Sequence, residues 1–470
     1  MVSPVRAAGR LFELGGTAAF WHAVLSTCLR VLEGFGLAIV TGSILAVLTS
    51  RFAILKYLFQ PFLGVIRATP VASLIILALV WLAVARIPVF VVFLMVMPIV
   101  WTNLFAGLDV IDPQLLEMGR VFQFGCWKKL RYIYLPSLMP YIVSALVTGL
   151  GAAWKSAIGA EVIARPVGSM GRYVYDSRIH LLMADLFAWT IAVIVLSVLL
   201  EKLMVRLLGI LSRRLAGTRR AGLEKRHNAL SSVGADLVSA RSGKLAGQTQ
   251  GLPLQGATTR VADSHGAGIK FEKVSKSFGD KVVIRDFSLA LPPSGVVAFM
   301  GASGYGKTTL LRLLSGLEQP DSGRVVAEYE RLSMVFQEDR LLGGVTALGN
   351  VLAVLDRKDE VFAMEWLVRM GLGDSAHLLP HELSGGMRRR LAIARAMAYG
   401  GDVMLLDEPF AGLDDATREQ IYPYMFDRRD TSRLTILVTH DRQEAERLAD
   451  RLIVMEGPVL TVVEDVLVGR

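Results

Sequence analysis

The chain has 470 residues, of which 53% are hydrophobic and 20% are charged, and its formal net charge is +9. This length allows two or three domains, and the apolar fraction is higher than a wholly soluble enzyme needs. The two cysteines, Cys28 and Cys126, form no CxxC pair, so neither a disulfide framework nor a cysteine metal site is indicated.

The apolar residues gather in residues 1–211, which we predict to be an all-α transmembrane domain in contact with the lipid bilayer. Five apolar runs come near the roughly 20 residues that cross a bilayer. The predicted spans are Val31–Thr49, Pro70–Ala85, Pro88–Gly107, Met139–Ile158 and Leu186–Ile210. The second run is short, and we expect it to extend backwards through Tyr57–Thr69 as one tilted helix.

Residues 212–268 form a basic segment without sustained apolar periodicity, which predicts a flexible linker. Between Arg213 and Arg260, nine Lys and Arg residues stand against two acidic ones, so most of the net charge lies here. No aromatic residues interleave these charges. We therefore expect a tether beside anionic lipid and no nucleic-acid partner.

From residue 269 to residue 470 the pattern is that of a soluble α/β domain. An apolar run over 295–300 leads into GASGYGKTT at 301–309, which has the G-x-x-x-x-G-K-[ST] spacing of a P-loop. Glycines let backbone N–H groups cradle phosphates, the lysine reaches the β- and γ-phosphates, and the hydroxyl holds Mg²⁺. The candidate nucleotide-binding residues here are Gly301, Ser303, Gly304, Gly306, Lys307, Thr308 and Thr309.

A second apolar run over 403–406 ends in two acids. Asp407 is placed to bind Mg²⁺ through water, and Glu408 to polarise the attacking water. Together with the P-loop, these acids predict an ATPase with ATP and Mg²⁺ as its cofactors.

The sequence LSGGM at 383–387 resembles the ABC signature, and with it residues 269–470 resemble the ABC transporter ATPases, which have a helical subdomain. The resemblance implies a homodimer, because each signature closes over the ATP of the opposite domain and one chain carries one of each. It implies adenine stacking by Phe278, γ-phosphate sensing and metal binding by Gln337, and a catalytic switch role for His440. It also implies nucleotide contacts by Ser384, Gly385, Gly386 and Asp414, with Thr308, Gln337 and Asp407 at the metal.

Residues 112–136 are too basic to span a membrane, yet they carry apolar residues at helical spacing: Val121, Phe122, Phe124, Trp127, Leu130 and Tyr134. The segment resembles the EAA coupling loop of binding-protein-dependent importers, which docks on the ATPase. On that resemblance Glu117 and Gly125 are the candidate coupling residues. An odd number of spans places this loop and the ATPase on one side, predicted to be cytoplasmic, with the N-terminus outside.

The whole chain thus resembles a bacterial ABC importer of the nitrate/sulfonate/taurine type, with a type I importer permease and its ATPase fused. The resemblance implies a multi-pass protein of the bacterial inner membrane and a periplasmic or lipid-anchored substrate-binding protein as partner. The expected solute is a small anion or a thiamine-precursor-like molecule. Lys155 could attract an anion, pair with Glu161 or extend to the outer interface.

Two alternatives remain open. An ABC exporter half-transporter would have about six spans with long cytoplasmic extensions and no coupling loop of this kind. A P-loop ATPase without a transport function would not explain the hydrophobic N-terminal part of the chain.

Overall fold

The computed structural model describes residues 4–215, 268–426 and 433–468. By their contacts these residues fall into two units, one of Met1–Ile111 with Tyr134–Leu215, and one in which Asp112–Ile133 joins the C-terminal part of the chain. Residues 216–267 of the predicted linker lie outside the described residues, and residues 212–215 continue a helix.

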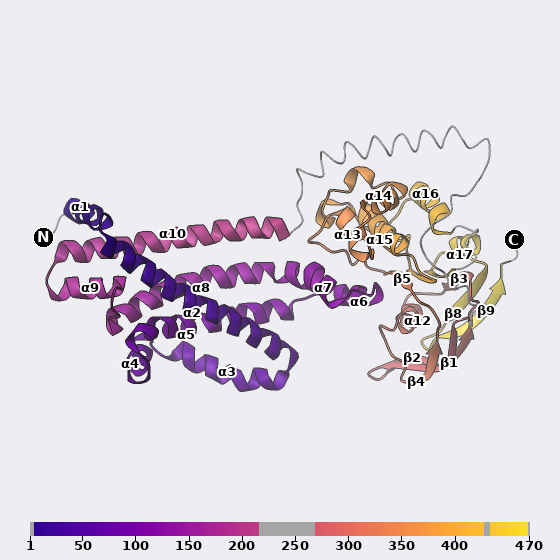
Figure 1. Ribbon diagram of the computed structural model, residues 1–470. Coiled ribbons are helices and arrows are strands. Elements are labelled where there is room, and N and C mark those ends of the chain that lie inside the picture. The colour runs from indigo at the N-terminus through magenta and orange to yellow at the C-terminus, as the bar shows by residue number, and fades with distance from the viewer. Residues whose placement is uncertain (1–3, 216–267, 427–432, 469–470) are drawn as a thin grey trace. The chain divides into compact units, whose positions relative to one another are not determined.

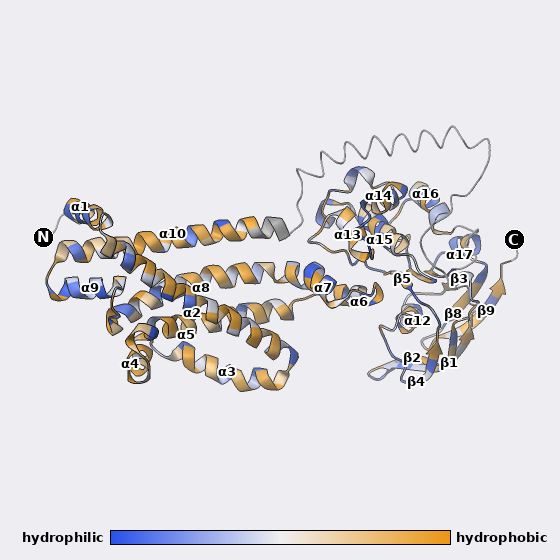
Figure 2. Ribbon diagram, in the orientation of Figure 1, coloured by the Kyte–Doolittle hydropathy of each residue, from blue (hydrophilic) through white to orange (hydrophobic). Residues whose placement is uncertain are grey.

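The first unit is built of helices (Figure 1). They are α1 Pro4–Gly15, α2 Ala18–Arg51, α3 Ala53–Ala68, α4 Val71–Trp81, the 3-10 turn η1 Val84–Arg86, α5 Ile87–Asp109, α8 Leu135–Ala164, α9 Met170–Ile179 and α10 Met183–Leu215. Hydrophobic residues run along α2, α5, α8 and α10 in Figure 2, whereas hydrophobic and hydrophilic residues alternate along the helices of the C-terminal part. Among the described residues four helical spans are long and apolar enough to cross a membrane.

The span expected over Pro70–Ala85, with its tilted extension, is wrong as one continuous helix. It consists of α3 and α4, which are bent by 105° at a short break, and the span count reaches five when this bent pair counts as one. Thr69 is extended before Pro70. This is the physical reason for the break, because a proline disfavours helical backbone in the residue before it.

The core of the first unit depends on small residues along α2. Gly34, Ala38, Gly42 and Ala46 recur every fourth residue and are buried, so they form one stripe along which α5 can approach closely. A Cβ at Gly34 would lie 2.6 Å from the carbonyl oxygen of Val89 on α5. The α2–α5 pair therefore has no room for a larger side chain at this position.

The second unit holds two sheets and their helices. A six-stranded sheet has the order β5-β6-β7-β3-β8-β9, and β2-β1-β4 form a three-stranded antiparallel sheet. The strands are β1 Lys270–Phe278, β2 Lys281–Ala290, β3 Gly295–Met300, β4 Ser322–Val326, β5 Leu332–Val335, β6 Val403–Asp407, β7 Leu434–Thr439, β8 Arg451–Glu456 and β9 Thr461–Leu467. The helices of this part are α12 Lys307–Leu314, α13 Ala347–Val354, α14 Glu360–Arg369, α15 Gly385–Tyr399, α16 Asp415–Met425 and α17 Arg442–Leu448, with 3-10 turns at Gly373–Ser375 and Pro380–Glu382.

The central strands β3, β5, β6, β7 and β8 pair in parallel, and β9 is an antiparallel edge. Every residue of β6 and β7 is buried, as expected for a parallel sheet covered on both faces. The fold class predicted from the sequence, a helical membrane domain followed by an α/β P-loop domain, is confirmed.

The α2–α5 packing gives a direct test. We expect Gly34→Val to destabilise the folded protein by about 1–3 kcal/mol, because the added side chain overpacks the contact with Val89. Gly36→Val is the matched control, since a Cβ at Gly36 meets nothing within 4 Å. Thermal unfolding of the two purified variants in detergent checks this; equal stability would mean that α2 and α5 do not pack as described.

Candidate functional site

The carboxyl ends of three neighbouring parallel strands carry the predicted nucleotide-binding and catalytic residues. Met300, the last residue of β3, pairs with Thr439 on β7, and Asp407 on β6 pairs with Val438. Because parallel strands end at one edge of a sheet, the turn after Met300, the acids after Leu406 and His440 after Thr439 meet there. Residues more than 100 positions apart in the sequence thus share one site.

The glycine-rich turn between β3 and α12 has backbone conformations that require glycine. Gly301 has φ +153°, and a Cβ there would lie 2.2 Å from the carbonyl oxygen of Met455. Gly306 has φ +89° and precedes the first turn of α12, whose free N–H groups favour an anion. The other predicted residues, Ser303, Gly304, Thr308 and Thr309, belong to the same turn and helix start.

Lys307 is buried at the start of α12, and its Nζ donates hydrogen bonds to the carbonyl oxygens of Gly301 and Ala302, both at 2.8 Å. Burial lowers the pKa of Lys307, and the nearby Asp407 and Glu408 oppose this effect. The ammonium group therefore lies over the loop, close to where a phosphate bound by that loop would lie.

Two oxygen donors that suit Mg²⁺ face each other across the turn. Thr308 Oγ1 lies 3.4 Å from Asp407 Oδ1. Asp407 is 2% exposed, and burial raises its pKa to about 6. The hydroxyl and carboxylate fit a divalent cation that takes its remaining ligands from phosphates and water. Gln337, the third predicted metal residue, is exposed at the end of the β5 segment.

Glu408 and His440 lie next to each other, with His440 Nδ1 3.6 Å from Glu408 Oε1. Glu408 has φ +46°, and its N–H donates to the carbonyl oxygen of Val438 on β7. A left-handed backbone conformation costs free energy for a residue with a Cβ. The hydrogen bond from Glu408 N–H to β7 stabilises this conformation. His440 is 69% exposed in its side chain, so this pair opens to solvent.

Arg389 on α15 was not among the residues singled out from the sequence. It is 4% exposed, and its guanidinium donates to backbone carbonyls on two sides. On one side Nη1 reaches Phe336 O at 2.6 Å and Gln337 O at 3.1 Å. On the other side lie the carbonyls of Asp407, Glu408 and Pro409, at 2.5–2.9 Å. One side chain therefore ties the segment of Gln337 to that of Glu408.

The predicted signature residues do not join this site within the chain. Ser384 caps α15 by accepting the N–H of Met387, and Gly385 and Gly386 begin the helix. No hydrogen bond or ion pair between described residues links these three to the P-loop. Asp414 caps α16, and its hydrogen bonds with Thr417 lower its pKa. Phe278, at the end of β1, is 46% exposed with Lys276 Nζ 5.3 Å from its ring.

The predicted coupling segment contacts the ATPase. It comprises α6 Pro113–Val121, α7 Cys126–Lys129 and the π-helical turn η2 Leu130–Tyr134 that leads into α8. Glu117 accepts hydrogen bonds from Arg312 on α12, at 2.7 and 3.0 Å, and from Arg340, at 2.7 Å. These bonds, with Arg312 as the main contributor, hold the pKa of Glu117 below its usual range. The carboxylate is therefore charged at neutral pH.

An aromatic contact lies beside this ion pair. Phe122 is buried and its ring meets that of Tyr399 edge to face, with centroids 5.1 Å apart. The guanidinium of Arg395 lies 5.2 Å from the same ring and donates to the carbonyl oxygens of Asp339 and Arg340. Lys128 Nζ donates to Leu355 O at 2.9 Å. The segment thus contacts α15 and the residues that follow Gln337.

The docking face is smaller than the sequence pattern indicated. Val121, Phe122 and Phe124 are buried, but Trp127 is 73% exposed and Leu130 is 46% exposed. The reason is that α6 ends at Val121 and a new helix begins at Cys126, so helical spacing does not carry through the segment. Gly125 is the N-cap residue before α7, and a Cβ there would meet nothing within 4 Å.

In the membrane domain, Glu161 is fully buried and pairs with Arg30 at 3.0 Å and with the hydroxyl of Thr27. Lys155 is exposed. The pairing of Lys155 with Glu161, one of three readings of this lysine, is therefore wrong, because Arg30 occupies the carboxylate.

Comparisons with known proteins agree with these features. The model of the ABC transporter family matches residues 284–411, and the model of the binding-protein-dependent transport system inner membrane component matches residues 38–217. An aliphatic sulfonates import ATP-binding protein of Paracoccus denitrificans is 40% identical over 197 residues, which cover 41% of this chain and 81% of that protein.

A second aliphatic sulfonates import ATP-binding protein, from Rhodococcus jostii, is 41% identical over 43% of this chain and 76% of its own. An Fe(3+) ions import ATP-binding protein of Brucella melitensis is 40% identical over 40% of this chain and 58% of its own. A solved ATP-binding cassette, described as a dimeric post-hydrolysis state bound to ADP and Pi, is 26% identical and covers 43% of this chain, with a TM-score of 0.39. The chain therefore belongs to the ABC transporter family, as an importer-type fusion of a permease with its ATPase.

Proposed function

We propose that this protein imports a small solute across the bacterial inner membrane, driven by ATP hydrolysis in its cytoplasmic domain. The observation that carries the proposal is the contact of Glu117 with Arg312 and Arg340. Glu117 belongs to the segment that leads into a membrane helix, and both arginines belong to the ATPase. A change at the nucleotide can therefore act on the permease through charged groups in direct contact.

The proposed hydrolysis uses the residues gathered at the sheet edge. The P-loop N–H groups and Lys307 bind the phosphates of ATP, and Mg²⁺ held by Thr308 and Asp407 neutralises phosphate charge. Glu408 orients and polarises the attacking water, and His440 beside it holds the γ-phosphate region. Gln337, tied to Glu408 through Arg389, reports the state of the nucleotide.

Two copies of the chain are needed for a complete site in this proposal. Ser384, Gly385 and Gly386 cap and begin α15, where free N–H groups can meet a phosphate. They are not joined to the P-loop of their own chain, so we assign them, with Asp414, to the ATP held by a second copy. A homodimer then has two equivalent composite sites, with Phe278 beside each adenine.

For the solute, we propose a small organic anion delivered by an external substrate-binding protein. The match to an inner membrane component of binding-protein-dependent systems supports the partner. Two of the similar ATP-binding proteins are named for aliphatic sulfonates, which supports an anion, although another is named for Fe(3+) ions. Closure of the ATPase dimer on ATP would switch the permease to an outward-facing state, and hydrolysis would return it to an inward-facing state.

Reconstitution tests the function. The full chain in proteoliposomes, with its substrate-binding protein, should accumulate an aliphatic sulfonate only when ATP is supplied on the ATPase side. Glu408→Gln should bind ATP but reduce hydrolysis at least about 100-fold, and uptake should fall with it. Glu456→Gln, at an exposed carboxylate, is the control. ATP hydrolysis without accumulation across a panel of sulfonates, nitrate and thiamine-precursor pyrimidines would contradict import.

Arg389 gives a separate prediction, because it positions Glu408 without touching the substrate. Arg389→Gln removes most of its bonds to five carbonyls and should lower kcat about 10- to 100-fold, as loss of two or three hydrogen bonds to a charged group implies. The KM for ATP should change little, since the P-loop is untouched. Arg388→Gln is the control, because that neighbour donates to Leu383 O and lies 3.9 Å from Asp339, and these interactions reach neither Gln337 nor Glu408. A rise in KM with unchanged kcat would contradict the positioning role.

A further inference from the structure

A polar stripe runs along α3, which is otherwise apolar. Lys56, Gln60 and Arg67 are exposed and separated by four and seven residues, so they lie on one face of the helix. On the same helix the exposed residues Ile54, Leu58, Phe62 and Val65 are apolar. The stripe therefore differs in character from the rest of the exposed surface of α3.

The two cations of the stripe both reach α5. Arg67 Nη2 donates to Thr102 Oγ1 at 3.2 Å. Lys56 Nζ lies 4.7 Å from the centroid of the Phe105 ring. Thr102 and Phe105 are one turn apart on α5, which is itself a candidate membrane span. The positive charges thus converge on one short stretch of α5.

This stretch belongs to the helix that is long and apolar enough to cross the bilayer. Thr102 is seven residues before Asp109, the last residue of α5, which is about 10 Å at the rise of an α-helix. Arg67 lies in the last turn of α3, just before the break that separates α3 from α4, and this bent pair counts as one candidate span. Its guanidinium turns to α5 at that depth. Contact of a charged arginine side chain with lipid at that depth costs free energy. Charged residues in membrane spans therefore face protein or a water-filled path.

Several other arginines of the same unit, though not all of them, have acidic partners. Arg30 pairs with Glu161, Arg10 with Asp185 and Arg86 with Glu33. Within the described part of the chain no carboxylate pairs with Lys56 or Arg67. The α3 stripe is therefore a concentration of uncompensated positive charge in a membrane domain, and an anion is what it would favour.

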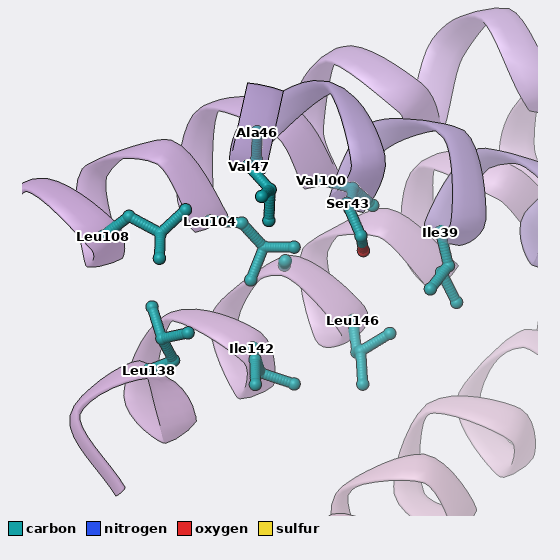
Figure 3. Close-up of a pocket in the computed structure, with 11 residues that line it drawn as sticks. Ile39, Ser43, Ala46, Val47, Val100, Leu104, Leu108, Leu138, Ile142 and Leu146 are labelled. Carbon is teal, nitrogen blue, oxygen red and sulfur yellow. The ribbon is translucent and has the colours of Figure 1, made fainter. Parts of the chain in front are cut away.

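The apolar cavity of about 270 Å³ on the other side of α5 does not serve this purpose. It lies between α2, α5 and α8 and is lined by leucine, isoleucine, valine and alanine, with Ser43 as its polar residue (Figure 3). Leu104 and Leu108 point into it from α5. A charged solute in this cavity would lose its hydration water, and the apolar lining offers few polar groups to replace that water. The face of α5 with Leu104 and Leu108 therefore differs in role from the face with Thr102 and Phe105.

We propose that the α3 stripe, with Arg67 and Thr102 at its centre, lines the path of the imported solute and selects an anion. The inference rests on the proposed import function and deepens it by naming the residues that recognise the charge. Arg67 contacts the anionic group as it passes, and Lys56 offers a second cation nearer the start of α3. Arg67 is exposed in the last turn of α3, directly before the bend that follows Ala68.

Thiol labelling tests this in the full chain in membrane vesicles, without solute, ATP or binding protein. In a background with Cys28→Ala and Cys126→Ser, Gln60→Cys is treated with an anionic sulfonatoethyl and a cationic trimethylammonioethyl methanethiosulfonate. Ile194→Cys, on exposed apolar α10, is the control for a lipid-facing position. Gln60→Cys should react with both reagents, and Ile194→Cys should not. Adding Arg67→Gln should lower the anionic-to-cationic rate ratio roughly tenfold, and Arg67→Lys should retain it.

Two results would overturn the proposal. If Gln60→Cys is as unreactive as Ile194→Cys, the stripe is buried in a dry contact, for instance with a second copy. If Arg67→Gln leaves the rate ratio unchanged, Arg67 does not set the charge of the path. Either result, together with intact ATP-driven uptake, removes only this inference. Failure of uptake with normal labelling removes the proposed function, and the stripe is then a hydrated, anion-attracting surface without a transported solute.

Discussion

The ion pair of Glu117 with Arg312 and Arg340 is the interaction through which the proposed coupling of ATPase and permease acts. Glu117 is 22% exposed in its side chain and Arg340 is 7% exposed, so the pair is partly shielded from water. Loss of Glu117 would leave the nearly buried Arg340 with Glu338, at 3.4 Å, as its remaining acidic partner among the described residues, and should cost about 1–3 kcal/mol. A contact of this strength can transmit force, whereas a solvated surface pair is worth little.

Both arginines are close in sequence to residues at the nucleotide site. Arg312 lies on α12, five residues after Lys307, and Arg340 lies three residues after Gln337. On the other side Arg395 of α15 holds the carbonyl of Arg340 and covers Phe122, while Arg389 of α15 holds Gln337 and Glu408. The helix after the P-loop, the segment of Gln337 and α15, which holds the proposed catalytic acid Glu408 through Arg389, therefore all contact the short segment that carries Glu117 and Phe122.

What the sequence could predict was local. A P-loop has fixed spacing, and residues 295–314 do form a strand, a glycine turn and a helix. The bend after Ala68 was missed because a hydropathy average over many residues does not detect a local break. Pro70 was the residue that indicated it, since a proline disfavours helical backbone in the residue before it. Arg389 could not be recognised, since its partners are backbone carbonyls of distant segments. The exposure of Trp127 depends on a helix break that apolar spacing does not reveal.

The central claim is that Glu117 couples the two halves through Arg340. The most direct test is a double-mutant cycle on the number of solute molecules imported per ATP hydrolysed, using Glu117→Gln, Arg340→Gln and both together. If the two residues act through each other, each single change lowers the ratio and the double variant is no worse than the poorer single one. Additive losses, or a ratio unchanged by Glu117→Gln, would contradict coupling at this contact.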